Sequence, residues 1–281
     1  MMEPAERGII DQEVDVFGMT DVGKVRKRNE DHFLICSLHK LMHVHNTSLP
    51  DLDQLPLGAQ RMAFMALVAD GVGGHAGGDV ASRMATESIA HYITRSMQCY
   101  YTRDPNEEVF IDQLYETVMQ CHEDLLAETE KHPEQDGMAT TLTLFLGILP
   151  RGYIVQVGDS RCYQLRAGKL NQITRDQTLA QDLIDKGVLT ASKAGAYSHV
   201  LSSAVGGTVA APVIYKMNLQ QDDVLLLCSD GLTTHVTDDQ IRGVLVEMES
   251  SEQACRKLVS AALAGGGRDN VTVIVGRAKA A

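Results

Sequence analysis

Hydrophobic positions along the chain fall into short runs of strand length, which occur in groups rather than alternating one by one with helices. The uninterrupted apolar run at 62–69 predicts a buried strand. Turn signals such as Pro150-Arg151-Gly152 separate neighbouring runs. This grouping favours antiparallel sheets. The other predicted strands cover 13–19, 31–37, 140–149, 152–157, 161–165, 213–219, 223–228 and 271–275.

Apolar residues that recur at helical spacing predict helices between the groups of strands. Thr237 and Gln240 have the spacing of a capping box, and Gly187 is placed to end the third predicted helix. Residues 38–60 and 188–212 lack periodicity and are predicted to be loops. Strands and helices in this order predict an α+β fold with helices outside antiparallel sheets. The predicted helices cover 79–98, 106–129, 178–186, 237–247 and 251–264.

The composition narrows the class of protein. Of the 281 residues, 44% are hydrophobic and 22% are charged, which is ordinary for a globular chain. The formal net charge of -12 argues against a surface that binds the phosphate backbone of nucleic acid. The six cysteines lack metal or disulfide spacing, and neither a signal peptide nor a membrane span is evident. We therefore expect a cytoplasmic protein, with one domain over 1–281 and no membrane partner.

Four aspartates come at the ends of predicted strands, beside glycine or serine. Asp70 follows the 62–69 run, Asp159 and Asp230 follow two later strands, and Asp269 precedes the last strand. A single aspartate in such a place is usually a turn residue. Four that converge would repel one another unless cations neutralise them, and Mg²⁺ or Mn²⁺ prefer such oxygen ligands. The pattern therefore predicts a divalent metal site.

The chain also resembles the bacterial form of the protein phosphatase type 2C family, the metal-dependent serine/threonine phosphatases. Matching segments occur in order over about residues 14–276. The resemblance implies a four-layer αββα sandwich, in which two antiparallel sheets lie between two pairs of helices. It also implies hydrolysis of phosphoserine and phosphothreonine in proteins. The segments are DVGKVRKRNEDHF, LVADGVGGHAGGDVAS, GMATTLTLF, VGDSRCYQLRAGKL, ITRDQT, SSAVGG, LLLCSDGL and GGRDNVTVIV.

This resemblance implies roles for the acidic residues. Asp70 would bridge two ions of Mn²⁺ or Mg²⁺, with the Gly71 carbonyl on the second ion and Asp230 and Asp269 on the first. Asp159 matches an aspartate that contributes to a third ion in bacterial members. Two such ions share a water, lower its pKa and present it in line with the phosphorus.

Further polar residues complete the implied site. Glu30 and Asp31 match an acidic pair that supports the ions through bound waters, and Arg26 matches an arginine that holds the substrate phosphate. A guanidinium can bond two phosphate oxygens at once, although basic runs such as 24–28 are often only solvated. His75 has two open roles, which are protonation of the leaving oxygen and a hydrogen bond to a metal-bound water.

Three segments depart from the family pattern or vary within it. Gln177 stands where a histidine after aspartate is more usual. Residues 180–205 correspond to a variable flap beside the cleft that influences the choice of substrate. The 38–60 insertion carries three histidines, whose H-x-H spacing can bind transition metals but lacks accompanying Cys or carboxylate ligands. These histidines are His39, His43 and His45.

The sequence leaves three functions to compare. The leading one is a phosphatase that acts on phosphorylated proteins and opposes a bacterial serine/threonine kinase. A phosphatase-like binding module without catalysis is the main alternative, and the retention of Asp70, Asp230 and Asp269 argues against it. A metal-dependent nuclease is disfavoured by the acidic charge. No cysteine lies in the C-x5-R frame of a cysteine-dependent phosphatase.

Overall fold

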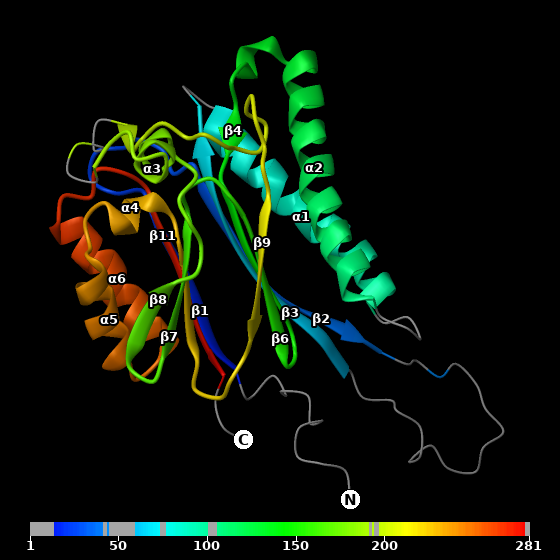
Figure 1. Cartoon of the computed structure of the whole chain (residues 1–281), viewed down its shortest axis with the longest axis vertical. Helices are drawn as coiled ribbons and strands as arrows, with labels where there is room; N and C mark the ends of the chain where they lie inside the picture. The colour runs from blue at the N-terminus through cyan, green and yellow to red at the C-terminus, as the bar shows by residue number, and fades with distance from the viewer. Residues whose placement is uncertain are drawn as a thin grey trace, which may run out of the picture.

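Two antiparallel β-sheets pack face to face, and a pair of helices covers the outer face of each sheet (Figure 1). This four-layer αββα arrangement confirms the predicted α+β class. The structure is a computed structural model that describes residues 14–41, 44, 60–73, 77–100, 106–190, 193 and 197–278.

The first sheet has the strand order β1-β11-β10-β7-β8. Strand β11 lies between β1 and β10. In the antiparallel β1–β11 pair, Asp21 lies opposite Val271 and Val14 lies opposite Ala278. This pairing brings the loop that follows β1 beside the loop that precedes β11. The strands are β1 (Val14–Asp21), β7 (Arg161–Arg166), β8 (Lys169–Gln172), β10 (Val224–Cys228) and β11 (Val271–Ala278).

The second sheet has the strand order β2-β3-β5-β6-β9, and the short β4 pairs with the end of β3. The β2–β3 hairpin sets Asp31 directly opposite Asp70. The register of this hairpin therefore places two acidic residues side by side at one end of the sheet. The strands are β2 (Asp31–Lys40), β3 (Gln60–Val72), β4 (Ala139–Thr140), β5 (Leu142–Ile148), β6 (Arg151–Val157) and β9 (Val213–Asn218).

The long helices cover the sheets, with α1 and α2 on the second sheet and α5 and α6 on the first. The Thr237–Gln240 capping box at the start of α5 is present as predicted. No helix within the described ranges is long and apolar enough to cross a bilayer. The helices are α1 (Gly77–Tyr100), α2 (Glu107–Lys131), η3 (Pro133–Gln135), α3 (Leu179–Asp185), α4 (Asp230–Thr233), α5 (Asp238–Val246) and α6 (Ser251–Ala264).

Strand β5 shows why the inner strands are apolar throughout. All of its residues are buried, because helices cover one face and the other sheet covers the opposite face. Leu142, Leu144 and Leu146 pack toward α1 and α2, whereas Phe145 packs between the sheets. Alternate residues of one strand thus serve two different cores.

The predicted loop at 38–60 is wrong at both ends. Residues 38–40 continue β2 and Gln60 begins β3, because the hairpin goes on pairing across a register shift at Leu38/His39. His43 and His45 lie outside the described residues. The hydrophobic pattern also fails to predict β8, η3 and α4, since each is too short to show a period.

Helix α2 offers a test of the outer core. Leu114 is fully buried against the second sheet, whereas Leu126 on the same helix is 40% exposed. We expect Leu114→Ala to lower the free energy of unfolding by about 2–5 kcal/mol, because it leaves a cavity. Leu126→Ala should cost less than about 1 kcal/mol. Urea unfolding measures both, and equal losses would contradict the assigned packing.

Candidate functional site

Five aspartates meet at one end of the sandwich. Asp31 and Asp70 pair across β2 and β3 in one sheet. Asp230 begins α4 just after β10, and Asp269 lies just before the neighbouring strand β11 in the other sheet. Asp159 lies in the turn by which the chain passes from β6 to β7, and so from one sheet to the other. The structure therefore brings together all four strand-end aspartates predicted from the sequence, with Asp31 beside them.

Asp31 is the most deeply placed of the five and is 4% exposed. Its Oδ2 accepts hydrogen bonds from Ser229 Oγ at 2.8 Å and from Thr272 Oγ1 at 2.6 Å. Its Oδ1 is buried with no hydrogen-bond partner. Burial raises the pKa of Asp31 to about 6, although the two hydroxyl bonds oppose the change. A buried carboxylate oxygen in this state is suited to facing a cation or its water shell.

Asp70 lies within a strand rather than after it, which corrects the boundary predicted from the sequence. Strand β3 continues to Val72 because β4 supplies pairing partners for its last residues. The Asp70 backbone carbonyl accepts from Thr140 Oγ1 and from Thr141 N, both at 2.9 Å. Its backbone N–H donates to Thr141 Oγ1 at 3.1 Å. These bonds fix the backbone from which the Asp70 carboxyl projects.

Burial, and then the crowding of carboxyls, raises the pKa values of the cluster. Burial and then the neighbouring Asp31 and Asp230 raise the pKa of Asp70 well above its ordinary value. Burial and then Asp230 raise the pKa of Asp159 to about 8. The pKa of Asp230 is also raised, by burial and by Asp269, although a hydrogen bond from Asp70 opposes this. Desolvation and like charge thus act together on the group.

Close contacts of glycine backbone hold the loops around the acidic end. A Cβ atom on Gly71 would overlap the Gly78 carbonyl, and one on Gly231 would overlap the Asn270 carbonyl. Gly71 N also donates to the Glu30 carbonyl at 3.1 Å. These positions therefore require glycine for steric reasons. The contact at Gly71 brings the start of α1 close to β3, the strand that carries Asp70. The contact at Gly231 brings the start of α4 close to Asn270, just before β11.

Arg26 and Asp269, which the sequence assigns to different roles, form an ion pair in this structure. Arg26 Nη2 donates to Asp269 Oδ2 at 2.7 Å. Asp269 Oδ1 accepts from Asn270 N at 2.9 Å. The Arg26 side chain is 50% exposed and has further N–H donors, so it can also face solvent.

Asn270 is a structural residue that the sequence reasoning missed. Its Oδ1 accepts from Glu30 N at 2.9 Å, and its Nδ2 donates to the carbonyls of Val22 at 3.0 Å and Arg28 at 2.9 Å. Ser82 Oγ donates to the Glu30 carbonyl at 2.6 Å from the other side. Asn270 is buried, and the only signal of this role in the sequence is an amide directly after Asp269. Asn270 positions the loop that carries Arg26 and Glu30.

Gln177, the departure from the family pattern, holds the turn that carries Asp159. Its Oε1 accepts from Gly158 N at 2.8 Å, and its own N–H donates to the Gly158 carbonyl at 3.0 Å. Its Nε2 donates to the Ala211 carbonyl at 2.9 Å. Gly158 has a φ of 97°, a conformation that favours glycine. The amide therefore joins the Asp159 turn to the segment before β9.

The structure describes most of the flap but not His75. His75 lies outside the described residues, together with 74 and 76. Two residues just before the flap pair with its far end: Leu179 N donates to the Val200 carbonyl at 2.8 Å, and Thr178 forms a β-bridge with Leu201. Asp230 feels the charge of His199, which opposes the rise in the pKa of Asp230 caused by burial and Asp269. Residues 197–201 therefore return to the acidic end of the sandwich.

The carboxyls fit hydrated divalent ions. Within the described ranges, no three Asp, Glu, His or Cys side chains already surround one point closely enough to hold a metal ion. Mg²⁺ usually keeps several waters and takes only one or two carboxylates directly. The unpartnered Oδ1 of Asp31 and the raised pKa values of Asp70 and Asp159 match such a site, because a cation would favour their charged forms.

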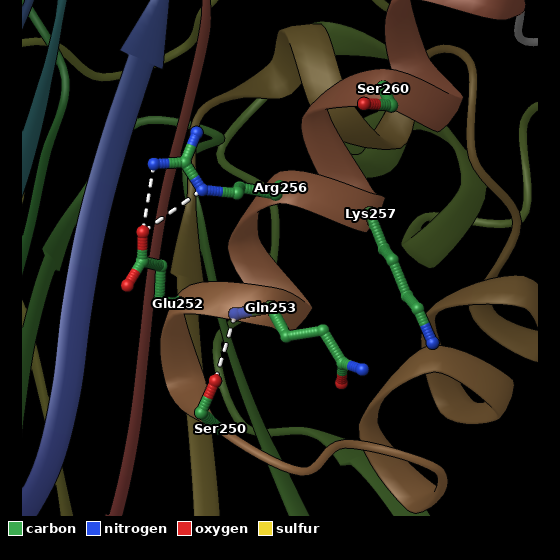
Figure 2. Close-up of a pocket in the computed structure, with 6 residues that line it drawn as sticks. All are labelled: Ser250, Glu252, Gln253, Arg256, Lys257 and Ser260. Atoms are coloured by element: carbon green, nitrogen blue, oxygen red, sulfur yellow. Dashed lines mark hydrogen bonds and ion pairs between the residues drawn. The ribbon is translucent and has the colours of Figure 1, made fainter.

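A shallow depression lies along helix α6, away from the aspartates (Figure 2). Arg256 turns back onto Glu252, with Nη2 donating to Oε1 at 2.8 Å. Ser250 Oγ caps the helix by accepting from Gln253 N at 3.2 Å. Arg256, Glu252 and Ser250 thus already have partners within this helix or at its start.

Comparisons with known proteins agree with this αββα fold. The chain belongs to the protein phosphatase 2C family, whose model matches residues 46–265. The serine/threonine protein phosphatase PstP of Mycobacterium tuberculosis is 37% identical over 225 residues, which cover 79% of this chain and 41% of PstP. The chain thus spans about two fifths of the length of that relative.

Two further similarities extend over most of the chain. The serine/threonine phosphatase stp of Listeria monocytogenes is 29% identical over 262 residues, which cover 91% of this chain and 92% of that protein. A crystal structure of the catalytic domain of PstP in complex with two manganese ions superposes with a TM-score of 0.73. It is 31% identical in sequence and covers 95% of this chain and 99% of that one.

The raised pKa of Asp159 predicts a pH dependence of stability in protein stripped of divalent cations. Its pKa is about 8 in the folded state, against an ordinary value of 3.8. The folded state therefore binds more protons than the unfolded state between these values. The stability that protonated Asp159 contributes is fully present below the unfolded pKa and is lost as pH rises toward 8. The loss is at most about 1.4 kcal/mol per pH unit for each carboxyl that titrates.

Urea unfolding in a chelator at about pH 6 and about pH 8 measures this dependence. The Asp159→Asn variant should show a smaller fall between the two conditions, because its side chain does not ionise. An equal fall in the variant and in the unaltered protein would contradict the role assigned to Asp159.

Proposed function

We propose that this chain is a metal-dependent phosphatase that hydrolyses phosphoserine and phosphothreonine in proteins. The cluster of five aspartates, with one buried oxygen of Asp31 left without a partner, supports this most directly. A protein has little reason to crowd so many desolvated carboxyls at one place unless cations bind there. Membership of the protein phosphatase 2C family supports the reaction itself.

The chemistry of the cluster supports Mn²⁺ or Mg²⁺ as the ions. Asp70, the Gly71 carbonyl, Asp230 and Asp269 would hold two of them, and Asp159 would hold a third. When bound, such ions lower the pKa of a coordinated water and offset charge on phosphoryl oxygens. The two manganese ions in the PstP catalytic domain support the same choice of metal for this chain.

The protein's own side chains orient the reactants around that centre. Arg26 would hold the substrate phosphate with guanidinium donors that Asp269 does not use. Asp31, fixed by the hydroxyls of Ser229 and Thr272, would accept hydrogen bonds from water through its unpartnered Oδ1. Glu30 would act beside it, since Asn270 anchors its backbone.

The substrates would be phosphorylated proteins, and the opposing enzyme would be a bacterial serine/threonine kinase. Curated relatives named serine/threonine phosphatases support this class of substrate. We place the reaction in the cytoplasm, where such kinases find their targets.

Loss of a carboxylate should abolish turnover. We expect purified protein with Mn²⁺ to hydrolyse p-nitrophenyl phosphate and a phosphothreonine peptide, and a chelator to stop both reactions. Asp230→Asn should lower kcat by at least about 100-fold, because several kcal/mol of charge stabilisation depend on the bound ions. Steady-state kinetics measure this. Full activity of the variant, or no turnover by the unaltered protein, would refute the proposal.

The activity should depend on the guanidinium group of Arg26 and not only on its positive charge. We expect Arg26→Lys to lower kcat/KM for the phosphothreonine peptide by about 10-fold, because an ammonium cannot bond two oxygens in the fork geometry of guanidinium. Arg242→Lys, an exposed position on α5, serves as the matched control and should leave kcat/KM unchanged. Equal kcat/KM values for the two variants would contradict the assignment of Arg26 to the substrate phosphate.

A further inference from the structure

Five exposed basic residues lie on two loops at the acidic end, and we call them the basic rim. One loop, 22–30, joins β1 to β2, and the other, 265–270, joins α6 to β11. In Figure 1 the two loops lie together at the upper left, in blue and in red. The basic rim consists of Lys24, Arg26, Lys27, Arg28 and Arg268.

Backbone hydrogen bonds hold the two loops against each other. Lys24 N donates to the Gly267 carbonyl at 2.7 Å. The buried Asn270 side chain donates to the carbonyls of Val22 and Arg28, one before and one after the basic stretch. A Cβ atom on Gly23 would overlap the Asp269 carbonyl, so the loops also touch sterically. The rim is therefore held in place beside Asp269.

Two members of the rim act on the acidic centre itself. Arg26 is ion-paired with Asp269, and the charge of Arg28 acts to lower the pKa of Glu30. Lys24, Lys27 and Arg268 differ, because within the described residues none of them forms an ion pair or a side-chain hydrogen bond. Residues present only to neutralise the aspartates would be paired with them, as Arg26 is.

The basic rim differs in charge from the chain as a whole. The formal net charge is -12, so acidic residues outnumber basic ones in the chain as a whole. The rim gives one region of opposite sign, next to the residue that we assign to the substrate phosphate. Lys27 adjoins Arg26 in sequence, and Lys24 is two positions away. An extended segment advances about 3.3–3.6 Å per residue, so flanking residues of a bound phosphosegment would pass these side chains.

We propose that Lys24, Lys27 and Arg268 bind anionic residues that flank the phosphorylated residue, so the preferred substrates are acidic phosphosegments. This rests on the proposed phosphatase function and names its substrate class. The occupant is an extended stretch of a phosphoprotein with Asp, Glu or a second phosphate near the target. Several exposed charges acting together give selectivity even though each alone contributes little.

The test compares three phosphothreonine peptides that differ only in their flanking residues, which are Glu, Gln or Lys. We expect kcat/KM of the unaltered protein with Mn²⁺ to be about 10-fold higher for the Glu peptide than for the Gln peptide, and lowest for the Lys peptide. A doubly phosphorylated peptide shows whether a second phosphate substitutes for Glu. High salt should reduce the preference, because the rim is exposed.

The rim variant Lys24→Glu/Lys27→Glu/Arg268→Glu should lose this preference, and its kcat/KM should fall more for the Glu peptide than for p-nitrophenyl phosphate, which has no flanking residues. The matched control, Lys169→Glu/Arg242→Glu/Lys257→Glu, also replaces two lysines and one arginine at exposed positions. Lys169 lies at the β7–β8 turn, which Figure 1 shows at the opposite end of the sandwich. The control variant should keep the preference.

Binding separates this proposal from the proposed catalysis. Fluorescence anisotropy of the same peptides with the Asp230→Asn variant should show tightest binding to the Glu peptide, and the rim substitutions should abolish that difference. An unchanged preference in the rim variant, or equal binding and turnover of all peptides by the unaltered rim, would overturn the rim assignment. Absence of turnover with retained, rim-dependent binding would overturn only the phosphatase function.

Discussion

The burial of several aspartates at one place, together with their mutual repulsion, is the constraint on which the rest of this structure depends. The pKa values of Asp31, Asp70, Asp159 and Asp230 are all raised, and burial is the largest cause for each. Left alone, such a cluster favours protonation and weakens the fold as pH rises. Divalent cations reverse that tendency, because they favour the charged forms. The free energy that the metal-free protein loses by burying these carboxyls is therefore recovered in part when cations bind.

Contacts between residues distant in sequence hold the backbone segments that carry these aspartates in place despite the repulsion. Antiparallel register sets Asp31 opposite Asp70, and the β1–β11 pairing brings the 22–30 loop to Asp269. Asn270 bonds three backbone groups of that loop, and Gln177 bonds the Asp159 turn. Neither amide carries charge, so each positions the acidic residues without adding to their repulsion. Packing of apolar side chains on both faces of the inner strands supports the whole arrangement.

Negative and positive side chains occupy separate parts of the acidic end. The centre is anionic and takes Arg26 as a partner, whereas the adjoining rim leaves Lys24, Lys27 and Arg268 toward solvent. If the proposed function holds, the acidic centre would bind the phosphoryl group of a substrate and the basic rim would bind the chain that flanks it. Separation of the two functions would let specificity vary on the loops while the strands keep the catalytic geometry.

Hydrophobic spacing and local motifs by themselves determined the type and order of most elements, the fold class and the candidate aspartates. Those features depend on neighbours along the chain, as the Thr237–Gln240 capping box shows. Only the tertiary structure decided that β3 runs through Asp70, that Arg26 pairs with Asp269, and that Asn270 and Gln177 hold the site together. Each of these contacts joins residues distant in sequence, and no periodicity within a segment reports on strand register or on which loops meet.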